Sequence, residues 1–312
     1  MTTRKALTRL LGTAALFLAP PALAQEAAPA AATAAPAPAV ETVDADPALW
    51  VVRDADTTIY LFGTVHLLRP GLSWFDEAVK EAFDASDEVV FEIVPGEGDA
   101  EVPALMRSLG AATDGVALSS RLTADQNTTY TAALGTVGLP AAAFEQAEPW
   151  VPGMLLSVLP LIAKGYDPAQ GVEMTLQRAA TEAGKRTSAL ETINLQLGLF
   201  DSLPLAAQVQ FLAQASDSAL AADDQLAQLV ILWGGGKPDE LGAAMNAEMA
   251  PYPQLEATLL TDRNRNWAEA LQAKMAQPGT VFVAVGAAHL AGDKSVQTFL
   301  AERGLVAERV AY

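Results

Sequence analysis

Short β-prone runs lie at both ends of the chain, and a long helix-rich stretch separates them. The runs are residues 48–52, 57–63, 88–94, 280–286 and 305–310. Such runs, rich in Val, Ile and aromatic residues and bounded by Gly or Pro, are typical of strands. Residues from about 101 to 275 are rich in Ala, Leu and Gln, which favours helices, with one short extended piece at 186–191. We therefore predict an α/β (α+β) fold: a central mixed sheet built from N- and C-terminal strands, with a large, mainly helical middle insertion.

The first 24 residues have the features of a secretory signal peptide. A basic start, a short apolar run and a small-x-small cleavage site follow one another at residues 4–9, 10–18 and 22–24. The apolar run is shorter than the roughly 20 residues that a stable membrane span needs. We predict cleavage after Ala24 and a periplasmic or secreted protein with no stable membrane anchor after cleavage.

Composition limits the partners that the mature chain can have. Residues 25–43 are mostly Ala and Pro and predict a flexible linker, so the folded domain is expected at residues 44–312. The formal net charge of −18 disfavours contact with phosphate backbones, and we expect no nucleic-acid partner. The absence of Cys excludes disulfides, thiolate metal ligands and a Cys nucleophile. No pattern indicates the oligomeric state.

The only two histidines of the chain occur in the same short pattern. The two segments are Gly63-Thr64-Val65-His66 and Gly286-Ala287-Ala288-His289, and each follows an apolar β run. A Gly at a strand end lets the backbone turn sharply or approach a ligand closely. The residues just past it project from the carboxyl edge of the sheet, where α/β proteins bind ligands. A lone His is often structural, but this pairing favours one joint site if the two strands are parallel neighbours.

The runs at residues 48–52 and 57–63, around a short acidic turn, predict a hairpin, and the run at residues 88–94 is expected to be its neighbour. Glu92 interrupts this otherwise apolar run. Burying an unpaired carboxylate in a strand that is covered on both faces costs free energy. Glu92 therefore needs a partner or an exposed position at the edge of the sheet. Two His and one carboxylate match a catalytic metal set with open coordination positions. The residues therefore point to a divalent metal held by His66, Glu92 and His289, with an exposed edge strand as the alternative for Glu92.

Further segments make the chain resemble the TraB/GumN family, relatives of the Tiki metalloproteases, over nearly all of residues 47–312. The segments that carry this resemblance are Gly63-x-x-His66, Phe91-Glu92, Pro149-Trp150, Gly171-Val172-Glu173, Leu190-Glu191-Thr192, Gln196, Arg263-Asn264 with Trp267, and residues 285–292. Glu173 is a departure, because family members usually carry Asp there, and the longer side chain argues against a direct role for this position.

The resemblance implies a metal-dependent hydrolase, by analogy with Tiki proteins that cleave peptide bonds using Mn or Co. The expected cofactor is a divalent ion (Mn, Co or Zn), and the expected substrate is a peptide or another small polar molecule. His66, Glu92 and His289 would be metal ligands or the base that activates water.

Other matched residues are expected to support this centre. Arg263 would hold a substrate carboxylate or stabilise a developing oxyanion, the alternative being an exposed helix charge. Glu191 would be a further ligand or an orienting group. Asn264, Gly63 and Gly286 would orient these groups or contact the substrate.

Two other classes of function remain open from the sequence. One is an exported protein that binds a metal ion or haem without turnover. The other is a metal-free hydrolase in which His and Glu act as the base. A tightly bound single metal, a visible haem band, or activity that survives chelation would distinguish the three.

Overall fold

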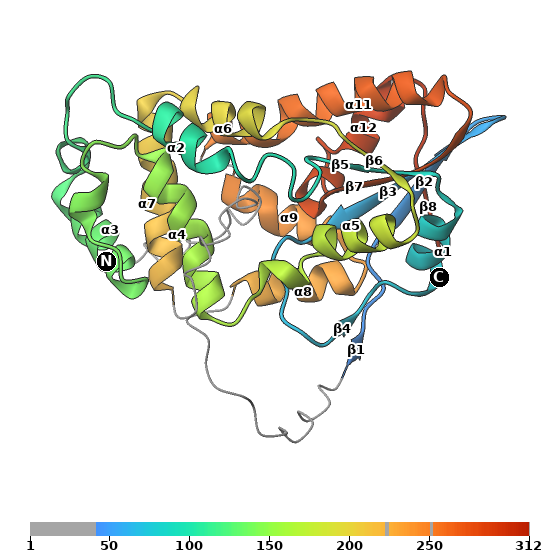
Figure 1. Cartoon of the computed structure of the whole chain (residues 1–312), viewed down its shortest axis with the longest axis horizontal. Coiled ribbons are helices and arrows are strands. Elements are labelled where there is room, and N and C mark those ends of the chain that lie inside the picture. Colours follow the sequence, from blue (N-terminus) through green and yellow to red (C-terminus); the bar gives the residue numbers. More distant parts are fainter. Residues whose placement is uncertain (1–41, 222–224, 250–251, 312) are drawn as a thin grey trace.

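The computed structural model of the chain describes residues 42–221, 225–249 and 252–311 (Figure 1). The predicted signal peptide at residues 1–24, and all but the last two residues of the predicted linker at 25–43, lie outside these ranges. Within them, no helix combines the length and the apolar character needed to cross a membrane.

A six-stranded mixed sheet forms the centre of the fold, with the strand order β6-β5-β7-β3-β2-β8. Its strands are β2 (Leu49–Arg53), β3 (Thr57–Thr64), β5 (Glu88–Phe91), β6 (Arg186–Ala189), β7 (Gly279–Gly286) and β8 (Glu308–Arg309). Strands β6, β5, β7 and β3 are parallel, whereas β2 is antiparallel to both β3 and β8. The predicted hairpin at the start of the domain and the mixed α/β sheet are confirmed. A separate parallel pair joins β1 (Val43–Asp44) to β4 (Leu72–Ser73).

The sequence predicted the position of β5 wrongly in two respects. Strand β5 was expected beside the hairpin, but the C-terminal strand β7 lies between β3 and β5. The strand was also expected to continue through Glu92, but it ends at Phe91. Glu92 therefore follows the carboxyl end of its strand, as the two histidines follow theirs.

Helices cover both faces of the sheet, because the central strands β3 and β7 carry buried apolar side chains on both sides. One face packs against α11 (Asp262–Met275) and α12 (Val296–Glu302) (Figure 1). The other face packs against α1 (Glu77–Ala85), α5 (Val172–Glu182), α8 (Gln225–Gly234) and α9 (Pro238–Met249). In β7, for example, Val281, Val283 and Val285 face α11, whereas Phe282 and Ala284 lie in the opposite layer.

The middle of the chain builds a helical part beside the sheet (Figure 1). It contains α2 (Val102–Leu109), α3 (Ala124–Thr136), α4 (Trp150–Ala163), α6 (Ile193–Asp201), α7 (Leu205–Leu220) and α10 (Pro253–Glu256). Its cores are centred on Trp150 with Phe211, and on Tyr130 with Leu212. The short extended piece expected at residues 186–191 is confirmed as β6, which pairs with β5 and returns the chain to the sheet.

Candidate active site

Three strand ends meet at one edge of the sheet and bring the predicted site residues together. Strands β3 and β7 are parallel neighbours in which Thr64 pairs with Gly286, and β5 flanks β7 on its other side. His66, Glu92 and His289 each follow the end of one of these strands by one to three residues, and all three are buried. The condition for a joint site, that the two Gly-x-x-His strands are parallel neighbours, is therefore met.

The two motif glycines allow close packing at this edge. A Cβ at position 63 would lie 3.1 Å from the Cα of Ala287, tighter than most real Cβ contacts. A Cβ at position 286 would lie 3.0 Å from Glu92 Oε1 and 3.8 Å from His66 Nε2. Gly286 thus leaves open the space between the carboxylate and the imidazole.

His66 is oriented by a carboxylate that the sequence analysis set aside. The His66 Nδ1 lies 2.5 Å from an oxygen of Glu173, and the Thr64 hydroxyl donates to the same oxygen. Glu173 stands in the first turn of α5, and the helix start lies against the motif because a Cβ on Gly171 would be 2.3 Å from the His66 carbonyl oxygen. Gly171 is the sequence feature that could have indicated this contact, because its lack of a side chain allows the helix start to approach His66.

Glu92 is a buried carboxylate that accepts hydrogen bonds from three groups. Its Oε1 accepts from the Gly286 N–H at 2.7 Å, and its Oε2 accepts from Arg263 at 2.6 Å and from Gln196 at 3.2 Å. Burial alone would raise its pKa, but the positive charge of Arg263 and the Gly286 N–H outweigh burial and lower the pKa to about 2. Glu92 is therefore an anion at neutral pH.

Arg263 joins the carboxylates of Glu92 and Glu191. Its Nε donates to Glu191 at 3.0 Å, and its Nη2 donates to Glu92 at 2.6 Å and to Glu191 at 2.8 Å. Its Nη1 donates to the Leu259 carbonyl at 3.1 Å and faces His289 Nε2 at 3.2 Å. These contacts engage all five guanidinium N–H groups. In this arrangement Arg263 has no N–H left for a substrate carboxylate. Because Arg263 is buried, the alternative interpretation of this residue as an exposed helix charge is wrong.

The carbonyl of Leu259 belongs to an irregular turn just before α11. Residues Ala257–Thr261 form a π-helical turn, a feature often found at functional sites. Glu191 also accepts from Trp267 Nε1 at 2.9 Å and from Gln196 at 2.9 Å. Trp267 and Gln196 thus belong to the same hydrogen-bond network as Arg263. Both are among the residues that carry the family resemblance, but the sequence predicted no role for them.

The nearest polar partners of His289 are a neutral amide and a guanidinium. Its Nδ1 lies 2.5 Å from Asn264 Oδ1, and its ring centroid lies 4.3 Å from that of Trp267. Burial lowers its pKa most, and Arg263 lowers it further against the opposing effect of Glu92, to about 3. The ring is therefore neutral at physiological pH.

The neutral state of His289 should make the folded chain sensitive to acid. Its pKa falls from 6.5 to about 3 on folding, so between these pH values the unfolded chain binds a proton that the folded chain excludes. The free energy of unfolding should therefore decrease as pH falls from 6.5 toward 3. Urea unfolding at a series of pH values should show a shallower decrease in His289→Gln than in the unaltered chain. The same pH dependence in both would contradict this assignment.

The model of the TraB/PrgY/gumN family matches residues 48–309. The chain belongs to this family. The match runs from β2 to β8, and it confirms the family expected from the motifs. No curated protein and no solved structure gave a match.

A three-ligand metal centre, as expected for this TraB/PrgY/gumN family member, does not fit the observed arrangement. In the part of the chain that the structure describes, no three His, Asp or Glu side chains are placed to hold one ion. The physical reason is Arg263, whose guanidinium donates to Glu92 and faces His289 Nε2. The Glu92 Oε2 and the His289 Nε2 thus already face a guanidinium, and the Glu92 Oε1 accepts from the Gly286 N–H.

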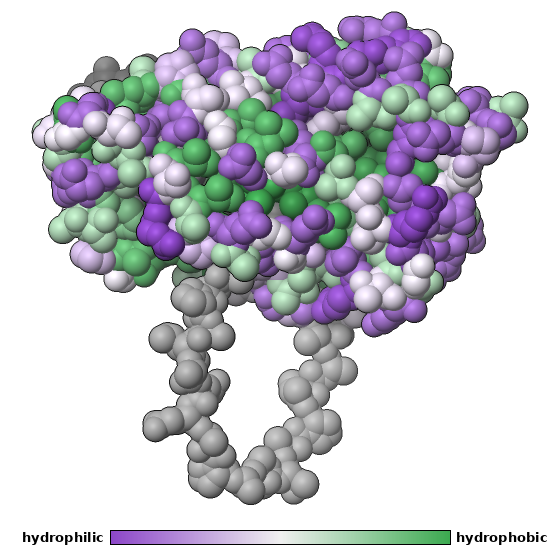
Figure 2. Space-filling model, turned by 45° about the horizontal axis from the view of Figure 1, so that its top comes forward, coloured by the Kyte–Doolittle hydropathy of each residue, from purple (hydrophilic) through white to green (hydrophobic). Residues whose placement is uncertain are grey.

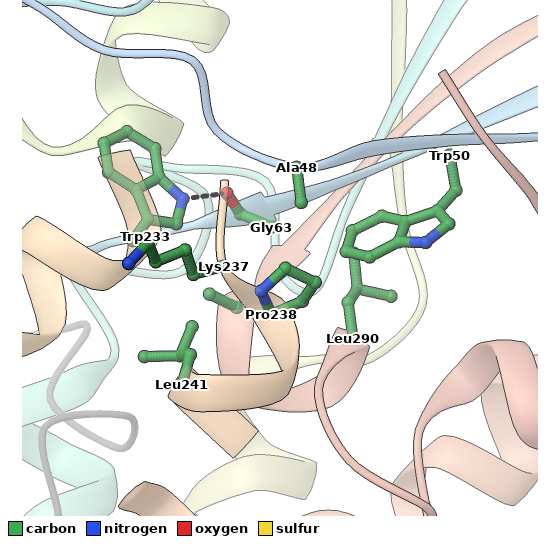
Figure 3. Close-up of a pocket in the computed structure, with 9 residues that line it drawn as sticks. Ala48, Trp50, Gly63, Trp233, Lys237, Pro238, Leu241 and Leu290 are labelled. Carbon is green, nitrogen blue, oxygen red and sulfur yellow. Dashed lines mark hydrogen bonds between the residues drawn. The ribbon is translucent and has the colours of Figure 1, made fainter. Parts of the chain in front are cut away.

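A small apolar hollow lies beside the first motif of this family member (Figure 3). It is lined by Ala48, Trp50, Gly63, Trp233, Lys237, Pro238, Leu241, Ala287 and Leu290. Trp233 Nε1 donates to the Gly63 carbonyl oxygen at 2.7 Å, the dashed line in Figure 3. Lys237 is the charged residue of this lining, which includes no carboxylate or imidazole of the site. The hollow therefore lies apart from those groups, beside the end of β3.

Proposed function

We propose that this chain is an exported hydrolase that acts on a peptide or another small polar substrate, with His66 as the base that activates water. The observation that supports it best is the His66–Glu173 contact of 2.5 Å beside the ionised Glu92. An imidazole held on one nitrogen by a carboxylate recurs among catalytic bases.

The chemistry follows from the tautomer that Glu173 selects. We take the Glu173 carboxylate, 2.5 Å from Nδ1, to favour the proton on that nitrogen, which leaves the lone pair on Nε2. Nε2 takes a proton from water, the water oxygen attacks the substrate carbonyl, and the proton passes to the leaving group as the C–N or C–O bond breaks. The imidazolium that forms in between lies against the Glu173 carboxylate, which stabilises its charge. In this proposal the water lies between His66 Nε2 and Glu92 Oε1, the two atoms nearest Gly286 on that side that can accept a proton.

Two exposed apolar side chains stand next in the chain to residues of the site, and we take them to favour an organic substrate such as a peptide. Met174 and Leu195 are 38% and 50% exposed. They are the chain neighbours of Glu173 and Gln196, which both contact the site. Figure 2 shows hydrophobic side chains gathered in the middle of the face that it presents, surrounded by hydrophilic ones. The Tiki resemblance points to the same substrate class.

Turnover of defined substrates tests the proposal. The mature chain, incubated with a peptide mixture and with simple amide and ester substrates, should give hydrolysis products by mass spectrometry. The same products should be lost in His66→Ala. No product from any of these substrates, or products that are unaffected in His66→Ala, would contradict the proposal.

A metal-dependent form of this hydrolysis is the second candidate. The observation that favours it is again Glu173, since metal-bound imidazoles commonly donate their other N–H to a carboxylate. Arg263 would first have to release Glu92, so the ion (Mn, Co or Zn) would be held by His66 and Glu92. Metal content after purification without chelator separates the cases. Stoichiometric metal that His66→Ala removes, with activity lost on chelation, supports this form, and metal without turnover supports the binding-protein alternative.

Export is tested separately from catalysis. The full chain, expressed with its own N-terminus in a bacterial host, should be recovered outside the cytoplasm beginning at Gln25. N-terminal sequencing of the recovered protein measures this directly. Recovery of chain that still begins at Met1, confined to the cytoplasm, would contradict export.

A further inference from the structure

We infer that the two motif histidines have different roles: His289 is a neutral acceptor that positions Arg263 against Glu92, and it is neither a proton carrier nor a metal ligand. This inference deepens the proposed function, because it leaves His66 as the only imidazole available for proton transfer.

Hydrogen-bond chemistry fixes the tautomer of His289. A guanidinium only donates, so His289 Nε2, at 3.2 Å from Arg263 Nη1, must accept. The single ring proton of the neutral imidazole is then on Nδ1, which donates to Asn264 Oδ1 at 2.5 Å. Asn264 is itself oriented, since its Nδ2 donates to the Lys294 carbonyl oxygen at 2.8 Å. The ring can reverse only if both partners move.

Packing holds the ring and the guanidinium as one unit. His289 is 1% exposed and lies against Trp267. The guanidinium carbon of Arg263 lies 4.7 Å from the centroid of the same indole. The Trp267 Nε1 donates to Glu191, which in turn accepts from Arg263. His289, Trp267 and Glu191 therefore constrain Arg263 in the position from which it donates to Glu92.

The partners of the two histidines differ in charge. His66 Nδ1 faces the carboxylate of Glu173, which stabilises an imidazolium. His289 Nδ1 faces the neutral amide of Asn264, and its Nε2 faces a permanent cation. Glu92 Oε1 is the one carboxylate oxygen recorded near that nitrogen, at 3.7 Å, and Glu92 is itself bound to Arg263. A proton or a metal ion on His289 Nε2 would have to displace Arg263.

Nuclear magnetic resonance of the imidazole nitrogens tests this directly, because the chain has only two histidines. We would label the histidine rings of the mature chain with ¹⁵N and assign the two rings with His66→Ala. Should that variant fail to fold, Asn264→Ser, which perturbs only the His289 ring, gives the assignment. For His289 we expect a protonated, pyrrole-type Nδ1 and an unprotonated, pyridine-type Nε2 at neutral pH. A protonated Nε2, or an imidazolium, would overturn the inference.

Diamagnetic Zn²⁺ added to the same sample tests the exclusion of metal. The His289 Nε2 resonance should stay unchanged at Zn²⁺ concentrations that saturate any response of His66, and it should also stay unchanged if His66 does not respond. A metal-dependent shift of His289 Nε2 comparable to that of His66 would overturn the inference. Neither measurement requires a substrate, so a failure to find hydrolysis would reject the proposed function without affecting this result.

A rescue series tests the positioning role in the folded protein. His289→Gln retains a side-chain acceptor, whereas His289→Leu retains volume but offers Arg263 no acceptor. We expect the Gln variant to be more stable to urea than the Leu variant and to retain more of any hydrolytic kcat at similar KM. Equal losses of stability in both variants would overturn the positioning role.

Discussion

Replacing Arg263 with methionine should lower the free energy of unfolding by about 3–5 kcal/mol, the range found when one partner of a buried ion pair is removed. The side chains of Glu92 and Glu191 are each only 5% exposed, and both depend on this guanidinium. Methionine fills similar space but leaves both carboxylates buried without a counter-charge. Urea unfolding followed by tryptophan fluorescence measures the loss.

A matched control lies two residues further along the same helix. Arg265 has a 56% exposed side chain and its recorded ion pair, with Asp262, has an N–O distance of 3.9 Å, so Arg265→Met should change stability by no more than about 0.5 kcal/mol. Adding Glu92→Gln and Glu191→Gln to Arg263→Met should recover part of the loss, because the uncompensated charges are then removed. Similar losses in the two single Arg variants would show that Arg263 is not the counter-charge of the site.

The paired glycines made the edge of the sheet predictable, but not the strand order. Gly63 and Gly286 each lie at or next to the end of a strand and precede a histidine, which favoured a joint site on the condition that the two strands are parallel neighbours. The neighbour of β3 was not predictable in the same way. Strands β5 and β7 are both short, apolar runs that suit a fully buried position, so their sequences do not specify which one pairs with β3.

The charges of the site were harder to predict than its histidines. Arg263 and Arg265 stand in the same helix beside Asp262, and nothing in that local pattern distinguishes the buried Arg from the exposed one. Glu173 was set aside for its length, yet from the first turn of α5 that length reaches His66. Long-range pairing of buried charges depends on tertiary packing, which local periodicity does not encode.

Replacing His66 with alanine should reduce the kcat of the proposed hydrolysis by about 100- to 10,000-fold, the usual contribution of a general base. The loss should fall mainly on kcat, since the imidazole acts on water and not on substrate binding. Added imidazole should restore part of the rate, because the small ring can enter the vacated space and accept the proton. Loss through KM alone, with no effect of imidazole, would exclude His66 as the base.

The Glu173 carboxylate should account for a smaller, separable part of the same rate. Glu173→Gln keeps the length of the side chain and an oxygen that can accept from His66 Nδ1, but it removes the negative charge. We expect about a 10- to 100-fold loss of kcat, by analogy with the range found when the carboxylate that orients a metal-bound imidazole is removed. Glu182→Gln, an exposed position at the other end of α5, should leave kcat unchanged. If Glu173→Gln kept full activity while His66→Ala lost it, the orientation of His66 would come from its backbone position and not from this carboxylate.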